Sequence, residues 1–226
     1  MEQKMKSLAG IVFISILLTG CENKEKIEKL EQENSSMREE IADLRKQNRQ
    51  ILFAGQNLKF LASKMKGIKA TIHTNYGSIS LDLFPEKAPV HCFAFITRAE
   101  SGFYDKTQFH RIMSGFMIQG GDPLSKNDNP DDDGLGGPIV SIPHEFNPIP
   151  HKRGILSMAR VGNVNMGAGS QFFIMHGENR SLDNQYTVFG SVSKGMDTVD
   201  KIAGVKVNQK DHPVKPVIIK TIEVKR

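Results

Sequence analysis

The stretch Phe109–Asp122, with the sequence FHRIMSGFMIQGGD, sets one arginine, one glutamine and several large apolar side chains along an extended segment. Successive residues of a strand point to opposite sides, so alternate residues share a surface. The residues that alternate in this way are Arg111, Met113, Met117 and Gln119. Gly115 permits a bend that brings Phe116 round to join them. The stretch therefore predicts a site in which a positive charge lies beside an apolar pocket.

This stretch resembles the signature strand of the cyclophilins, a family of peptidyl-prolyl cis-trans isomerases. Later blocks of the family follow in the same order and spacing, namely Gly154–Ala159, Ser170–Ile174, Leu182–Asp183 and Val188–Gly190. The resemblance covers about two thirds of the chain, from roughly residue 68 to the C-terminus, and does not reach the N-terminal third. It implies a mainly β fold, a closed eight-stranded antiparallel barrel capped by two helices.

The local patterns agree with a fold of short strands. Alternating residues at 70–74 and 78–83, separated by the turn Asn75–Gly77, predict two paired strands. Pro89 precedes an apolar helical pattern that runs to about Ser101. A weaker helical pattern lies near residues 194–202, and residues 217–224 predict a closing strand. Many short strands with few helices are typical of a closed barrel.

Prolyl isomerisation needs neither a nucleophile nor a metal, because the reaction is rotation about one C–N bond whose barrier of about 20 kcal/mol comes from amide resonance. A donor near the prolyl nitrogen stabilises the twisted transition state, and we assign Arg111 as that donor. The resemblance implies that Gln119 binds the substrate backbone. The substrate-binding residues that it implies are Phe116, Met117, Ala159, Arg160, Gln171, Phe173, Leu182 and Tyr186. We expect no cofactor and no metal.

Three positions depart from the best-known eukaryotic cyclophilins. Arg160 stands where asparagine follows Met-Ala, Ser181 where tryptophan precedes Leu-Asp, and Tyr186 where histidine precedes the Val-Phe-Gly block. We expect Arg160 to keep a role that depends mainly on backbone groups. Tyr186 can still present its ring and hydroxyl to the substrate.

The first 20 residues have the pattern of a lipoprotein signal peptide. Lys4 and Lys6 precede an uncharged run at residues 8–18, which is too short to span a bilayer as a helix. The run closes with Leu18–Cys21, which resembles a bacterial lipobox, so Cys21 is the predicted lipidated N-terminus. The predicted location is therefore the periplasmic or cell-surface side of a bacterial membrane, with the protein anchored by its lipid. The alternative is an ordinary secretory signal followed by a coincidental cysteine.

Residues 25–51 have a coiled-coil pattern. The core positions of one heptad are Ile27, Leu30, Asn34, Met37, Ile41, Leu44, Asn48 and Ile51. The residues that would face each other across a parallel dimer are opposite in sign: Lys26 with Glu31, Glu33 with Arg38, and Glu40 with Arg45. The pattern favours a parallel homodimer, and the alternative is a single charged helix supported by its own i,i+4 pairs. We thus expect a signal peptide at 1–20, a lipidated helical stalk at 21–66 and an isomerase domain at 67–226.

Composition excludes several other classes of protein. Thirty Lys and Arg against 25 Asp and Glu give a net charge of +5, without a basic stripe, so nucleic acid is not an expected partner.

With Cys21 used by processing, Cys92 remains as a lone cysteine in an apolar helical pattern, where we expect it to be buried. His110 is expected to be structural. The acidic residues 126–134 have an incomplete calcium-loop spacing and predict a solvated loop.

Two functions are consistent with these patterns. One is a membrane-tethered isomerase that accelerates rotation of Xaa-Pro bonds in exported, unfolded or flexible polypeptides. The other is a non-catalytic, lipid-anchored scaffold or chaperone that binds Pro-containing segments. Arg111 and Gln119 favour catalysis, because a protein that only binds has no need for a charge aimed at the prolyl nitrogen.

Overall fold

The computed structural model describes residues 21–137, 141–162 and 167–226. The chain divides into two compact units, one that ends at Ala54 and one that runs from Gly55 to Arg226. The predicted signal peptide at residues 1–20 lies outside the described residues. No helix in the described part of the chain is long and apolar enough to span a membrane.

The N-terminal unit consists of helix α2 (Cys21–Lys64), which continues past Gly55 into the second unit. The helix predicted for the stalk is thus present. Several of its apolar heptad residues are open to solvent in the single chain, with exposed fractions of 44% for Leu30 and 50% for Leu44. Pairing of this face with a second copy stays a prediction.

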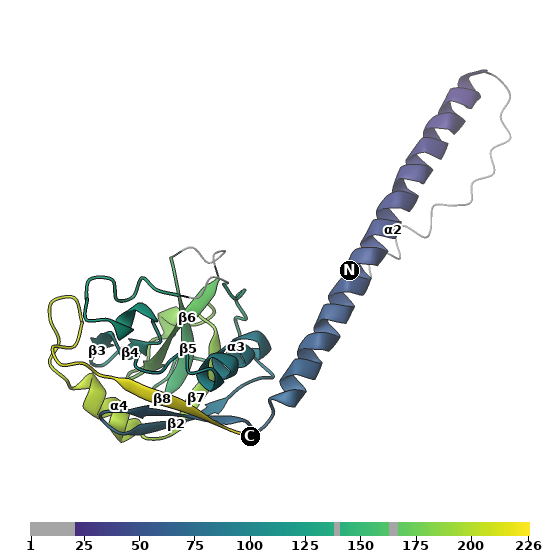
Figure 1. The fold of residues 1–226 in the computed structure, drawn as a ribbon. Helices are drawn as coiled ribbons and strands as arrows, with labels where there is room; N and C mark the ends of the chain where they lie inside the picture. The colour runs from purple at the N-terminus through teal and green to yellow at the C-terminus, as the bar shows by residue number, and fades with distance from the viewer. Residues whose placement is uncertain (1–20, 138–140, 163–166) are drawn as a thin grey trace. The chain divides into compact units, whose positions relative to one another are not determined.

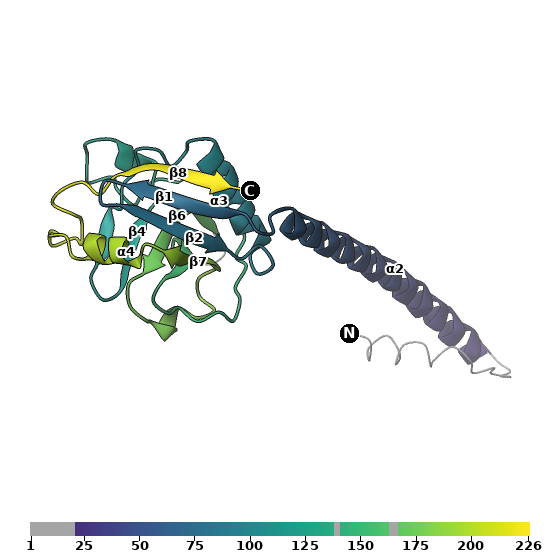
Figure 2. The same cartoon turned by 90° about the horizontal axis from the view of Figure 1, so that it is seen from below.

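The second unit is mainly β. Its strands are β1 (Lys69–Thr74), β2 (Ser78–Leu83), β3 (Arg111–Met113), β4 (Met117–Gly120), β5 (Ile155–Arg160), β6 (Ala168–Met175), β7 (Val188–Lys194) and β8 (Ile219–Lys225). All eight form one antiparallel sheet in the order β3-β4-β6-β5-β7-β2-β1-β8. In β1 and β2 every second residue is buried, as their sequence alternation predicts. Figure 2 shows β8, β1 and β2 side by side on the curled sheet.

The sheet curls into a half-barrel, and the prediction of a closed barrel is wrong. The edge strands β3 and β8 share no ladder of hydrogen bonds. Instead, β3 and the residues just before it meet the segment that leads into β8: Ile112 N donates to Asp211 O at 2.8 Å, and Phe109 N donates to Val217 O at 2.8 Å. Because β3 has only three residues and this segment occupies its free edge, the barrel cannot close there.

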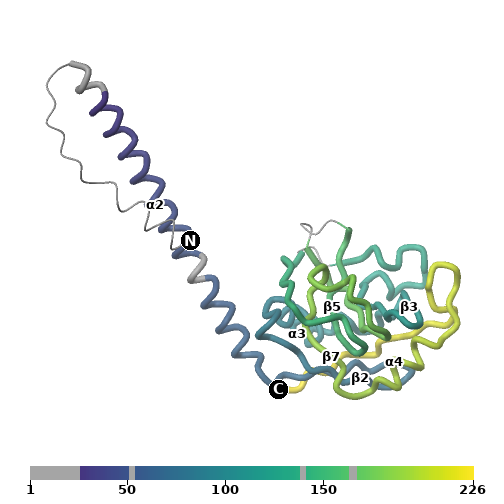
Figure 3. Tube along the Cα trace, turned by 180° about the vertical axis from the view of Figure 1, so that it is seen from behind, coloured from purple at the N-terminus to yellow at the C-terminus, as the bar shows by residue number. Residues whose placement is uncertain are grey.

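Two α-helices lie toward opposite ends of the curled sheet (Figures 1 and 3), as the sequence predicts. Helix α3 (Pro89–Glu100) begins with a proline, which suits the first helical turn. The Glu145 carboxylate accepts hydrogen bonds from Val90 N at 3.1 Å and from His91 N at 2.9 Å, and so satisfies two free N–H groups of that turn. Helix α4 (Met196–Ala203) buries Val199 and Ile202. Short 3₁₀ turns are η1 (Leu124–Lys126) and η3 (Arg180–Leu182).

An aromatic cluster forms the centre of the core between α3 and the sheet. Phe172 on β6 makes edge-to-face contacts with Phe95 at 5.5 Å, Tyr104 at 5.6 Å and Phe109 at 6.1 Å between ring centroids. Cys92 is fully buried in the same core, as expected, and burial raises the pKa of its thiol to about 12. At neutral pH this thiol is therefore protonated and packs as a small apolar group.

Candidate active site

The hairpin of β3 and β4 brings the predicted arginine and glutamine together. Arg111 and Gln119 are direct partners in the antiparallel register, as are Met113 and Met117. Gly115 has a φ of +77°, a conformation that is strained for other residues, and lies in the turn between the two strands. The bend predicted at this glycine is thus a hairpin turn, and it places both polar side chains on one face.

The guanidinium of Arg111 lies at the protein surface with partners on two sides. Its side chain is 45% exposed, and Nη2 lies 3.1 Å from the sulfur of Met113. Nε lies 3.7 Å from Oδ2 of Asp211, a residue whose positive φ of 61° belongs to the turn before β8. These contacts hold the group over the face of the hairpin and leave several N–H groups for a ligand.

A chain of amide hydrogen bonds fixes Gln119. Its Nε2 donates to Oε1 of Gln171 at 2.9 Å, and Nε2 of Gln171 donates to the carbonyls of Gly134 at 2.9 Å and Gly136 at 2.8 Å. The side-chain amide oxygen of Gln119, Oε1, has no hydrogen-bond partner among the described residues. It therefore remains an acceptor for a peptide N–H.

Beside these two residues lies a cluster of apolar side chains, which we call the cup. Its floor is a buried cluster of Met117, Phe173 and Met175. The partly buried residues that pack against this floor are Met113, Phe116, Ile155, Ala159, Leu182 and Tyr186. Phe173 and Tyr186 meet edge to face, with ring centroids 5.6 Å apart. The structure thus gathers six predicted residues into one apolar cluster, namely Phe116, Met117, Ala159, Phe173, Leu182 and Tyr186.

Behind the cup lies His151, which sequence reasoning did not select. Its buried ring stacks on Phe173 at 6.1 Å between centroids, and its nitrogens lie 3.1 Å from the Asp183 carboxylate and 2.8 Å from the Ser157 hydroxyl. The backbone N–H of His151 also donates to Asp183, and this bond is the main cause that lowers the pKa of the Asp183 carboxyl to about 2. This network ties the segment of η3 and Leu182 to the cup. No sequence pattern marks it, because its members come from separate segments: His151 from a loop, Ser157 from β5 and Asp183 from the end of η3.

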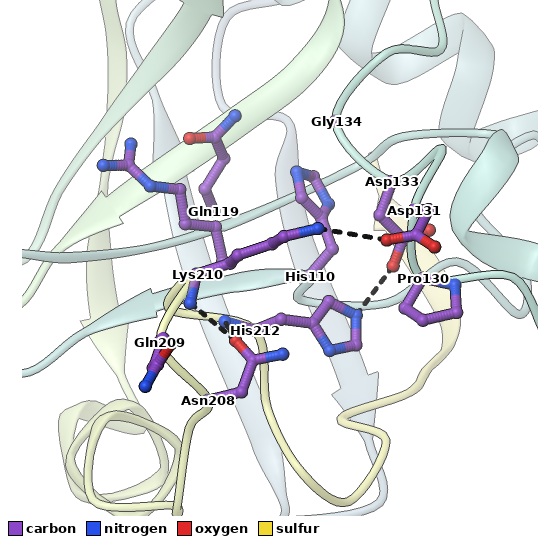
Figure 4. Close-up of a pocket in the computed structure, with 11 residues that line it drawn as sticks. His110, Gln119, Pro130, Asp131, Asp133, Gly134, Asn208, Gln209, Lys210 and His212 are labelled. Atoms are coloured by element: carbon purple, nitrogen blue, oxygen red, sulfur yellow. Dashed lines mark hydrogen bonds and ion pairs between the residues drawn. The ribbon is translucent and has the colours of Figure 1, made fainter.

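A pocket of about 600 Å³ adjoins Arg111 and Gln119 (Figure 4). The acidic loop and the turn before β8 form its walls, joined by His212 Nε2 to Asp133 at 2.8 Å and Lys210 Nζ to Asp131 at 3.1 Å. His110 lines this pocket and is only 5% exposed; burial is the main cause that lowers the pKa of its imidazole. Neither ring nitrogen of His110 has a partner in the described part of the chain.

The acidic loop is exposed at residues 126–131 and 134, as the sequence predicts, and it is also anchored at the active site. The buried carboxylate of Asp122 accepts hydrogen bonds from the backbone N–H groups of Leu124, Gly134 and Gly136, and so joins the two ends of the loop. The side chain of Asp133 is 6% exposed. Through Gln171 the loop supports Gln119, and through His212 it supports the turn that carries Asp211.

Comparison with family models matches residues 69–224 to the family described as cyclophilin type peptidyl-prolyl cis-trans isomerase/CLD. The chain belongs to the cyclophilin family. Peptidyl-prolyl cis-trans isomerase-like 3 of Gallus gallus is 40% identical over 161 residues, which cover 68% of this chain and 94% of the relative. Its Dictyostelium discoideum counterpart is 38% identical over 163 residues, which cover 70% of this chain and 95% of the relative.

Solved cyclophilins share the fold. The crystal structure of a Cryptosporidium parvum cyclophilin type peptidyl-prolyl cis-trans isomerase in the presence of the dipeptide ala-pro matches with a TM-score of 0.63 at 32% identity. The match covers 70% of this chain and 99% of that chain. The family match, the curated relatives and the solved structure identify this chain as a cyclophilin-type peptidyl-prolyl cis-trans isomerase.

The geometry of the hairpin and the cup is compatible with the two requirements of prolyl isomerisation. The cup can hold the proline ring while the rest of the peptide rotates. Arg111 can donate hydrogen bonds toward the prolyl nitrogen and the substrate carbonyl, which favours the pyramidal nitrogen of the twisted transition state. The amide oxygen of Gln119 can accept from the substrate backbone. In such a reaction each group would act by position and charge, without a covalent bond to the protein.

Proposed function

We propose that this cyclophilin accelerates rotation of Xaa-Pro bonds in exported polypeptides while a lipid on Cys21 tethers it to a membrane surface. The pairing of Arg111 with Gln119 beside the apolar cup carries the catalytic part of the proposal. The sequence Leu18–Cys21 after an uncharged run carries the tether. Two acyl chains would anchor the chain without a spanning helix.

A non-catalytic scaffold that binds Pro-containing segments is the alternative function. Such a scaffold would need the apolar cup to bind proline, but it would not need Arg111. The exposed guanidinium of Arg111, with N–H groups left for a ligand, favours catalysis over simple capture. An exchange assay on an Xaa-Pro peptide separates the two functions, because only an isomerase changes the rate of exchange.

If the lipid on Cys21 tethers the protein, removal of this cysteine should change the cell fraction in which the protein is found and leave its activity unchanged. In a bacterial host that processes lipoproteins, the natural chain is expected in the membrane fraction, and Cys21→Ser in the soluble exported fraction. Because the cup and hairpin do not involve this residue, kcat/KM is expected to be unchanged. Fractionation and the mass of the mature N-terminus are the measurements.

The chain's other cysteine provides the control. Cys92 is buried in the core, so Cys92→Ala is expected to leave the protein in the membrane fraction. A natural chain that is exported without an added lipid mass would refute the tether and support an ordinary secretory signal.

We also propose that α2 forms a parallel dimer with a second copy of the chain. The support is the exposed apolar heptad face and the opposite signs of the three expected cross-helix pairs. Leu30→Ser with Leu44→Ser is expected to shift a chain of residues 22–226 from dimer to monomer in sedimentation equilibrium. Gln32→Ser with Lys46→Ser, on the opposite face of the heptad, should leave the dimer intact. The unsubstituted chain of residues 22–226 would contradict the proposal if it stayed monomeric at the highest concentration at which it remains in solution.

A further inference from the structure

A second pocket, of about 460 Å³, extends from Gln119 and Gln171 along the wall formed by Ala159 and Arg160. Arg160 is the one charged residue among the described residues that line it. The others are glycines, apolar residues, one serine and the two glutamines. In contrast, the pocket beyond Arg111 contains the carboxylates of Asp131 and Asp133. That pocket also has the cations Arg111 and Lys210, so the two pockets that flank Gln119 differ in that only the second lacks carboxylates among its described lining residues.

The guanidinium of Arg160 is held in place by neutral groups. Nε donates to the carbonyl of Gln185 at 2.8 Å, and Nη1 donates to the carbonyls of Val161 at 3.0 Å and Gly162 at 3.1 Å. Its central carbon lies 4.7 Å from the ring centroid of Tyr186, a residue of the apolar cup. Arg160 thus stands between the cup and the second pocket, with a planar group fixed by three hydrogen bonds and one aromatic face.

None of these contacts neutralises the charge. No carboxylate lies within 4.0 Å of Arg160 in the described part of the chain, whereas Arg111, Arg153 and Arg180 each have an acidic partner. Carbonyl oxygens satisfy donors but leave the net charge in place, and Nη2 makes none of these bonds. A fixed cation at the wall of a pocket without anions favours a negative ligand group.

We propose that this pocket binds an acidic side chain of the substrate that flanks the proline, and that Arg160 selects it. The inference rests on the isomerase function of the cleft and names a class of substrate, polypeptides with aspartate or glutamate close to the proline. Asparagine, which stands at this position in the best-known cyclophilins, carries no charge that could make this selection. Arginine in place of asparagine at position 160 thus changes the substrate specificity, while the backbone groups of this position keep their role in binding the substrate.

The test is a panel of peptides with glutamate or glutamine at each position from three residues before the proline to two residues after it. At one position of the peptide, kcat/KM of the natural enzyme is expected to be about 3- to 10-fold higher with glutamate than with glutamine. This ratio is what a partly exposed, charge-assisted hydrogen bond between Arg160 and the glutamate carboxylate would give. Arg160→Gln should abolish this ratio, and Arg160→Lys should keep part of it. The ratio should fall with added salt.

Two controls separate charge selection from structural damage. Lys220→Gln removes one positive charge at an exposed site on β8 that lines neither pocket, so the ratio should remain. Uncharged peptides report the general integrity of the cleft in each variant. A ratio of one at every position in an active natural enzyme would overturn the proposal, as would a ratio that survives in Arg160→Gln.

Failure of the isomerase function gives a different result. If no peptide exchanges faster with the protein, titration of the same glutamate and glutamine peptides by NMR still measures their affinities. Tighter binding of the glutamate peptide that depends on Arg160 would then support the selection in a binding protein. Equal affinities would refute it.

Discussion

Arg111→Ala is expected to lower kcat/KM for an Xaa-Pro peptide by about two to four decades, measured by NMR exchange or a protease-coupled assay. Two charge-assisted hydrogen bonds in the transition state, each of about 1.5 to 3 kcal/mol, correspond to that loss at about 1.4 kcal/mol per decade. The side chain is 45% exposed and its nearest carboxylate is 3.7 Å away, so its removal leaves no buried group unpaired. The thermal stability of the variant should therefore match that of the natural protein.

Arg153→Ala is the matched control. Its side chain is also 45% exposed, and it pairs with Asp200 at a site that lines neither pocket. Its removal should change kcat/KM by less than about twofold, since exposed ion pairs contribute little. A loss of less than tenfold in Arg111→Ala would refute the role assigned to this guanidinium.

The second large effect is expected on stability. Phe172→Ala should lower the free energy of unfolding by about 3 to 5 kcal/mol, because it removes a fully buried ring and leaves a cavity. Edge-to-face contacts with Phe95, Tyr104 and Phe109 are lost with the ring. Denaturant unfolding, followed by circular dichroism of the sheet, is the measurement.

Phe93→Ala provides the comparison. This ring lies on α3 and is 47% exposed, so its truncation should cost less than about 1 kcal/mol. Similar losses in the two variants would show that the aromatic cluster does not dominate the core. The neighbour Phe173 lies on the other face of β6, in the cup, so Phe173→Ala should reduce kcat/KM more strongly than Phe93→Ala does.

Sequence reasoning found the residues that local periodicity places together. Arg111 and Gln119 lie on one face because both follow the alternation of a strand, and Gly115 between them has the positive φ that suits a hairpin turn. The cup residues on separate segments were found through the resemblance to the cyclophilins. Three members of the site were missed: His151, Asp211 and Met175. They carry no motif of their own and enter the site through contacts between distant segments.

The prediction of a closed barrel failed for a related reason. Closure depends on whether β3 and β8 meet, and the sequence of neither strand determines that. The turn before β8 forms its own hydrogen bonds, from Asn208 N to His212 O at 2.8 Å and from Asp211 N to Asn208 O at 3.1 Å, and places the Asp211 carbonyl against β3. β3 has only three residues, and the N–H of Ile112 is already paired with this turn.

The sequence by itself determined the strand alternation, the two helices, the arginine and glutamine of one face, and the cyclophilin family, because these depend on periods of a few residues or on motifs read in order. Only the tertiary structure decided that the sheet stays open and that the acidic loop is anchored by Asp122 and by the pair of Asp133 with His212. It also decided that the charge of Arg160 has no carboxylate partner among the residues that the structure describes. The physical reason is that these features are distances between segments far apart in the chain. Such distances are set by how the whole core packs, and no local pattern of residues encodes them.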